Sequence, residues 1–138
     1  MSPSPRRVKQ CTREEAQGRI KSAKAFLDAA SLVKAERDVE EFASVIAGLA
    51  VLAGIAATDA ICGIRLGRYS RGQDHHDAIA LLEVATRDGK GLASTLARLV
   101  DLKDQSHYGV IVVAPRKASD AVRWARILVE RASVELVP

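Results

Sequence analysis

The chain has 138 residues, enough for one domain with a substantial hydrophobic core. Hydrophobic residues make up 48% of it and aromatic residues only 4%, and this alanine-rich composition favours packed helices over sheets. Two cysteines are too few for a disulfide framework, so we expect a cytoplasmic protein in a reducing environment. The net charge of +4 permits an anionic partner such as nucleic acid but does not require one.

The first eleven residues (1–11) contain proline, serine and basic side chains, and we expect them to form a disordered arm. No apolar segment follows them directly, so no signal peptide is expected. The remaining residues, 12–138, are predicted to form a single domain. Its first helix starts with a capping-box pattern, Thr12 followed by Glu15, and should reach about Arg37.

A second helix is predicted from about Val39 to Leu66, with apolar residues on nearly all sides. It contains a run of 17 uncharged residues (42–58), which is close to the shortest length that spans a membrane. Ten of these 17 residues are Ala, Gly, Ser or Thr, so the run is only mildly hydrophobic. Small residues allow helices to approach closely, and we therefore interpret the run as the central helix of a bundle, with no membrane contact.

Three further helices are expected. The third should begin after Asp74 as its N-cap, and the fourth should end at about Tyr108. Pro115 suits the first turn of a fifth helix, in which Trp124 lies just beside the apolar stripe. The predicted fold is an all-α, up-and-down bundle of four or five helices.

The most distinctive segment is the arginine–histidine turn (65–77), where the second helix gives way to the third. Its arginines are Arg65, Arg68 and Arg71, and its histidines are His75 and His76. Arginine binds phosphate through a fixed fork of donors, and histidine moves protons near neutral pH. The N-terminus of the third helix would attract anions and favour the neutral imidazole.

This pattern predicts a phosphate site in which Arg68, Arg71, His75 and His76 act on a phosphodiester. RNA cleavage by its own 2′-hydroxyl needs a base, an acid and a cation, and no metal. The alternative is a solvated, arginine-rich turn whose histidines only cap the helix. We expect no metal site and no cofactor, because the neighbouring acids and histidines of the turn would point in different directions.

Four other residues could support phosphate binding. Asp59 lies near the end of an apolar helix, where a buried acid needs a partner such as Arg65 or Arg68. Such a pair would hold an arginine in place for phosphate, although Asp59 could equally lie where the helix leaves the core. Antiparallel packing could bring Lys103 and Tyr108 to the turn, where they would add a charge and a hydrogen-bond donor. An ordinary helix end is the alternative for this pair.

The spacing within the turn also resembles that of a known family. Four residues separate Arg71 from His76, and six separate Arg68 from His75. These spacings, the run leading to Gln-Asp-His and the order of the helices resemble those of HEPN domains, most closely the short bacterial ones. Their signature is an arginine and a histidine four to six residues apart near the start of a bundle helix. A small polar residue usually follows that arginine, where this chain has glycine or tyrosine.

The resemblance implies a HEPN-like RNA-binding protein or a metal-independent endoribonuclease of the toxin–antitoxin or phage-defence kind. It further implies a homodimer in which two chains form one cleft, with RNA, a nucleotide, an antitoxin or another protein as partner. The residues leave a second hypothesis open: a non-catalytic helical module that binds a protein partner or a nucleotide through the same surface.

Overall fold

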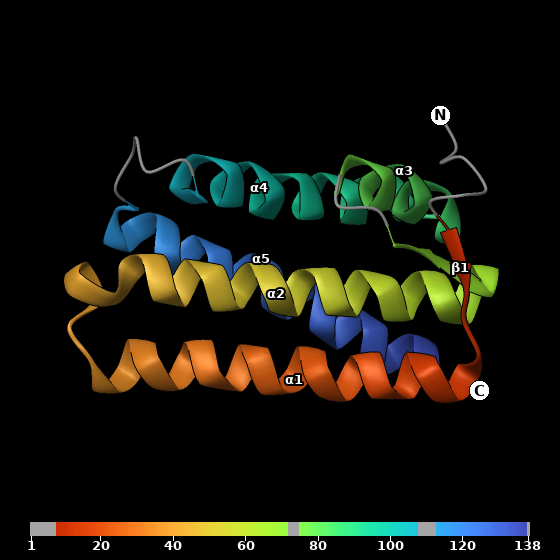
Figure 1. Cartoon of the computed structure of the whole chain (residues 1–138), viewed down its shortest axis with the longest axis horizontal. Helices are drawn as coiled ribbons and strands as arrows, with labels where there is room; N and C mark the ends of the chain where they lie inside the picture. The colour runs from red at the N-terminus through yellow and green to blue at the C-terminus, as the bar shows by residue number, and fades with distance from the viewer. Residues whose placement is uncertain (1–7, 72–74, 108–112, 138) are drawn as a thin grey trace.

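The computed structural model of the chain describes residues 8–71, 75–107 and 113–137. These residues form a helical bundle with one small two-stranded sheet (Figure 1). In chain order the elements are β1 (Val8–Gln10), α1 (Arg13–Glu36), α2 (Val39–Leu66), β2 (Arg68–Ser70), α3 (His76–Ala85), α4 (Gly89–His107) and α5 (Pro115–Leu136). The predicted all-α, up-and-down bundle is confirmed.

The first two helices begin where local patterns predict. The hydroxyl of Thr12 accepts a hydrogen bond from the Glu15 amide at 3.1 Å, and the Glu15 carboxylate accepts one from the Thr12 amide at 3.3 Å. The Asp38 carboxylate caps α2 by accepting hydrogen bonds from the backbone amides of Glu40 and Glu41. Gly67 ends α2 with φ at 71°, a left-handed conformation that costs glycine little.

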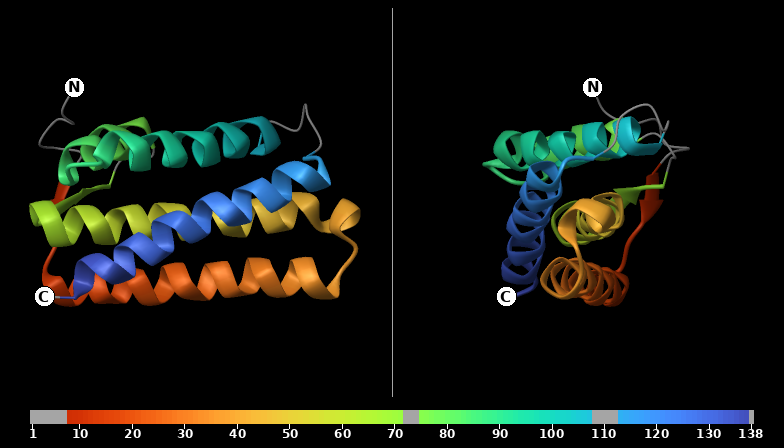
Figure 2. Two further views of the ribbon diagram at one scale, coloured as in Figure 1. Left: turned by 180° about the vertical axis from the view of Figure 1, so that it is seen from behind. Right: turned by 90° about the vertical axis from the view of Figure 1, so that its left-hand side faces the viewer.

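Helix α2 is the centre of the bundle. Helices α1 and α5 pack along it, while α3 and α4 form a layer over another side (Figures 1 and 2). Its buried residues are mostly alanine and glycine, so neighbouring helices approach closely. At Gly54, a Cβ atom would lie only 2.5 Å from the Leu99 side chain of α4. Among the described helices, α2 is the one that is long and apolar enough to cross a membrane, by length and composition only. In its most apolar stretch of 18 residues, 72% is buried inside the bundle.

The two strands were not predicted. They pair antiparallel, with Val8 opposite Ser70, Lys9 opposite Tyr69 and Gln10 opposite Arg68. The expected disorder of the first eleven residues is therefore wrong for Val8–Gln10, and residues 1–7 lie outside the described part of the chain. Three-residue strands are too short to show a period-two pattern in the sequence. Their pairing holds the N-terminal segment against the start of the arginine–histidine turn.

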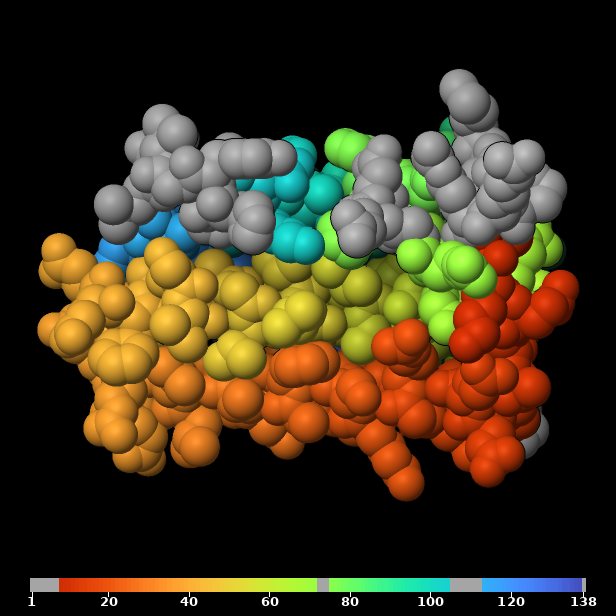
Figure 3. All heavy atoms as spheres, viewed as in Figure 1, coloured from red at the N-terminus to blue at the C-terminus, as the bar shows by residue number. Residues whose placement is uncertain are grey.

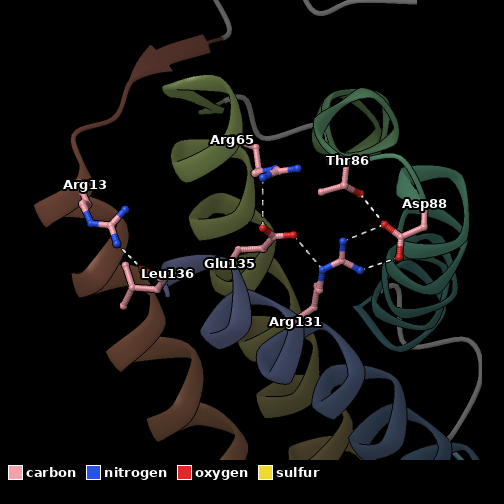
Figure 4. Close-up of polar contacts among 7 residues, drawn as sticks. All are labelled: Arg13, Arg65, Thr86, Asp88, Arg131, Glu135 and Leu136. Atoms are coloured by element: carbon pink, nitrogen blue, oxygen red, sulfur yellow. Dashed lines mark hydrogen bonds and ion pairs between the residues drawn. The ribbon is translucent and has the colours of Figure 1, made fainter. Parts of the chain in front are cut away.

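A polar network joins the corner between α3 and α4 to α5 (Figure 4). The guanidinium of Arg131 binds both carboxylate oxygens of Asp88, at 2.5 and 2.8 Å. Thr86 donates a further hydrogen bond to Asp88 at 2.9 Å, and Arg131 also contacts Glu135 at 2.9 Å. This bidentate geometry lowers the pKa of the Asp88 carboxyl below its usual range, because Arg131 favours the ionised form.

The tight corner leaves no room for a side chain at Gly89 unless the backbone shifts. A Cβ atom there would overlap the backbone oxygens of Leu82 and Glu83, whereas nothing lies within 4 Å of a Cβ atom built on Gly91. We expect Gly89→Ala to lower the free energy of unfolding by about 1–3 kcal/mol through steric overlap. Gly91→Ala is the matched control and should raise it by up to about 1 kcal/mol through helix propensity. Urea denaturation followed by circular dichroism measures both, and equal effects would contradict the proposed overlap.

Candidate functional site

The end of α4 meets the start of α3, as antiparallel packing predicts. Lys103 of α4 lies with its Nζ 3.0 Å from Nε2 of His75, which occupies the N-cap position of α3. A lysine ammonium can only donate, so Nε2 is the acceptor and a neutral His75 carries its proton on Nδ1. This contact joins two candidate groups that are 28 residues apart in the sequence.

Arg68 and Arg71 of the turn differ in exposure. Arg68 lies on β2, where alternation puts its side chain on the opposite face from that of Tyr69. Tyr69 is buried and Arg68 is half-buried, whereas Arg71, which follows the strand, is exposed. The hydroxyl of Ser70, on the same face as Arg68, is buried without a hydrogen-bond partner among the described residues.

The two histidines differ in the same way. His76 is the first residue of α3 and is exposed, whereas His75 is half-buried against Lys103. The expected N-cap, Asp74, lies outside the described residues, and the structure assigns that position to His75, whose side chain makes no capping hydrogen bond. Arg71 and His76 are thus both exposed, and Arg68 and His75 are both half-buried.

Asp59 has a partner that was not predicted. Its carboxylate lies 4.0 Å from Nε of Arg19 on α1, so the expected pairing with Arg65 or Arg68 is wrong. The guanidinium of Arg19 also lies 5.2 Å from the ring centre of Tyr69 and donates to its hydroxyl at 3.4 Å. Burial raises the pKa of Asp59 to about 7, and the charge of Arg19 only partly opposes this shift.

Arg19 was overlooked because it is far from Asp59 in the sequence. The available signal was its place directly before Ile20, at the edge of the apolar stripe of α1. An arginine at such an edge can reach the one acid buried in a neighbouring helix. The cluster of Asp59, Arg19 and Tyr69 ties α2, α1 and β2 together beneath the turn, and it holds Tyr69 rather than a phosphate-binding arginine.

Arg65, in the last turn of α2, makes its ion pair with α5. Its guanidinium lies 3.6 Å from the Glu135 carboxylate and extends the polar network of α5 (Figure 4). The support of the phosphate site by Arg65 therefore stays a prediction, and the contact that the structure shows for its charge is with α5. Tyr108 lies outside the described residues. Within the described ranges, no group of three or more His, Cys, Asp or Glu side chains is placed to hold a metal ion.

The chain matches no known family model, and neither curated proteins nor solved structures include a significantly similar one.

Asp59 should make the stability of the protein depend on pH. Above about pH 4 the unfolded chain has lost the Asp59 proton, whereas the folded protein keeps it up to about pH 7. The contribution of Asp59 to the free energy of unfolding therefore falls as the pH rises through this window and is constant above it. The stability of Asp59→Asn relative to the parent should rise by roughly 2–4 kcal/mol from pH 4.5 to pH 8.

Urea denaturation at the two pH values measures this difference. Asp28→Asn replaces an exposed carboxyl of α1 and is measured beside Asp59→Asn as the control. A difference between Asp59→Asn and the parent that does not change with pH would show that Asp59 is ionised throughout.

Proposed function

We propose that the chain binds RNA at the turn between α2 and α3 and cleaves it without a metal ion, as a HEPN-like endoribonuclease. The observation that carries this proposal is the 3.0 Å contact between Lys103 and His75. It adds a cation from α4 to the arginines and histidines of the turn, so that groups from two distant segments meet at one helix N-terminus.

The charge around the turn suits a phosphodiester. Arg68, Arg71 and Lys103 supply three cations, and the acid in the first turn of α3 is Asp77. The N-terminal end of α3 contributes further positive potential through the helix dipole. An RNA phosphate would therefore be attracted to this end of α3, and the attraction would weaken as the salt concentration rises.

Exposure favours one of the two arginine–histidine pairs for direct contact with RNA. Arg71 and His76 are exposed, whereas Nε2 of His75 is engaged by Lys103. We assign Arg71 to the phosphate and His76 to proton transfer. His75 with Lys103 then supplies charge and a second titratable group at the same site.

The reaction would proceed as an internal transfer. One imidazole removes the proton of the 2′-hydroxyl, and the freed oxygen attacks the neighbouring phosphorus. The bond from phosphorus to the 5′ oxygen breaks, and that oxygen takes a proton from the imidazolium that the first step formed. Arg71 would stabilise the negative charge that builds on the phosphate oxygens. The products are a 2′,3′-cyclic phosphate and a 5′-hydroxyl.

Cleavage of single-stranded RNA in the presence of a chelator tests this proposal. We expect fragments with 2′,3′-cyclic phosphate ends, and no cleavage by the variant with His75→Ala and His76→Ala together. Arg71→Ala should lower the rate about 100- to 1,000-fold, as expected when a group that stabilises the transition-state charge is lost. His76→Ala should lower it more than His75→Ala.

The control is Arg126→Ala, which removes an arginine that contacts Ser31 on the α1 side of α5. Its rate should equal that of the parent. Cleavage that persists in the double histidine variant, or that requires a divalent cation, would contradict the proposal. Binding of RNA without cleavage would leave the non-catalytic module as the function.

A homodimer is part of the proposal, and an apolar groove offers a surface for it. The groove has a volume of about 390 Å³ and is lined by α2 residues from Ser44 to Leu52, together with Lys103. Val45 and Leu52 are 49% and 44% exposed there. On this side of the molecule, α2 reaches the surface between α1 and the α3–α4 layer (Figure 3). Because Lys103 belongs to both the groove and the phosphate site, a second copy seated here would lie beside that site.

Light scattering on the purified protein tests the dimer. We expect twice the chain mass of 14.8 kDa for the parent and a monomer when Val45 and Leu52 are both changed to Glu. The control is Leu32→Glu, since Leu32 is a more exposed apolar residue on α1, and it should remain dimeric. A monomeric parent would contradict a composite site formed by two chains.

A further inference from the structure

A second pocket lies between α4 and α5, outside the arginine–histidine turn. It has a volume of about 180 Å³ and is lined by Arg98, Asp101, Leu102, Lys117 and Trp124. Trp124 is half-buried, which agrees with its predicted place beside the apolar stripe of α5. The guanidinium of Arg98 and the ammonium of Lys117 each lie 6.0 Å from the centre of the Trp124 ring. An aromatic face, two cations and an acid therefore share one small opening.

We propose that this pocket binds a single unpaired base of an RNA strand, with the base against Trp124 and the adjoining phosphate between Arg98 and Lys117. This inference rests on the proposed RNA binding at the turn. It adds a second place of contact, where one nucleotide of the strand is bound at a distance from the bond that is cleaved.

Each group in the pocket matches one part of a nucleotide. Every base has a flat face that can stack on an aromatic ring, and such stacking contributes about 1–3 kcal/mol per base. Arginine and lysine bind the phosphate. The carboxylate of Asp101 only accepts hydrogen bonds, so it suits the exocyclic amino group of adenine or cytosine better than the carbonyl edge of uracil.

The size of the pocket favours part of a strand over a free nucleotide. Pockets that enclose a whole small molecule usually have volumes of roughly 300–1,000 Å³. The volume of about 180 Å³ here is smaller, so one base fits with its sugar and phosphate outside. A longer strand supplies the remaining contacts elsewhere on the protein.

The start of α5 adds to the positive potential of the pocket. Lys117 and its neighbour Arg116 lie in the first turn of α5, which contains no acidic residue. Helices normally place acids at this end, because the dipole is positive there. Two cations at this end are stabilised when an anion lies between them and the helix amides, and the phosphate of the bound nucleotide is such an anion.

The pocket and the turn are neighbours on α4. Leu102 lines the pocket, and the next residue, Lys103, contacts His75. Successive residues of a helix point about 100° apart, so the two sites occupy adjoining sides of the same helical turn. Figure 2 shows α4 and α5 side by side. One strand that crosses α4 can therefore reach both sites.

Trp124 is the only tryptophan of the chain, so its fluorescence reports directly on the pocket. We would titrate the double histidine variant, which leaves the RNA intact, with oligoadenylate of about eight nucleotides in chelator and low salt. We expect quenching that saturates together with binding measured by anisotropy of a labelled RNA. Arg98→Ala with Lys117→Ala should weaken binding at least tenfold and remove the quenching. Oligouridylate should quench less than oligoadenylate.

Two variants serve as controls. Arg123→Ala removes an exposed cation of α5 that pairs with Asp120, and it should retain both quenching and affinity. Trp124→Phe keeps an aromatic face and should bind RNA more tightly than Trp124→Ala. If Trp124→Ala does not fold, two other measurements decide the outcome. They are the affinity of the variant with Arg98→Ala and Lys117→Ala, and the fluorescence of proteins that keep Trp124.

The results separate this inference from the proposed function. RNA binding without a change in Trp124 fluorescence, and with no loss of affinity in the cation variant, would overturn the inference and leave cleavage at the turn intact. Quenching that depends on Arg98 and Lys117, in a protein whose parent form cleaves no RNA, would support the pocket and overturn the nuclease. The absence of any RNA binding would overturn both.

Discussion

The close packing of small residues around α2 is the constraint on which the rest of the structure depends. Alanine and glycine leave little side-chain volume on this helix, so α1, α4 and α5 pack against its backbone at short range. Gly54 shows how closely the helices approach, because the Leu99 side chain occupies the space where a Cβ atom would be. Packing at this density leaves few alternative positions for the neighbouring helices. The packing around α2 thus determines where the chemical groups of the neighbouring helices lie.

The polar network of Arg131 complements this packing at one end of the bundle. Arg131 binds both carboxylate oxygens of Asp88 through two guanidinium nitrogens, and it thereby fixes the corner at which α4 begins. Lys103 lies 14 residues after Gly89, about 21 Å farther along a rigid helix. The orientation set at the corner therefore governs whether Lys103 reaches His75. A contact at the turn depends in this way on a network at the far end of α4.

Local patterns in the sequence predicted the helices well, because capping is decided within a few residues. Thr12 and Pro115 each mark a helix start in the sequence and in the structure. Long-range pairing was harder to predict. Arg19 and Asp59 are 40 positions apart, and no periodic pattern links an arginine at the edge of one helix to an acid buried in another. Helix order made the approach of Lys103 to the turn one of two alternatives, and the contact with His75 is the one that the structure shows.

The pairing of β1 with β2 has a practical consequence for how the protein is handled. Val8–Gln10 supplies the hydrogen-bonding partner for the segment that carries Arg68 and Tyr69. A truncation that starts the chain at the capping box of α1 would keep every helix and still leave β2 as a single unpaired strand. An affinity tag joined directly to Val8 would lie next to the arginines of the turn. Expression clones should therefore keep the native N-terminal segment and carry the tag at the other end.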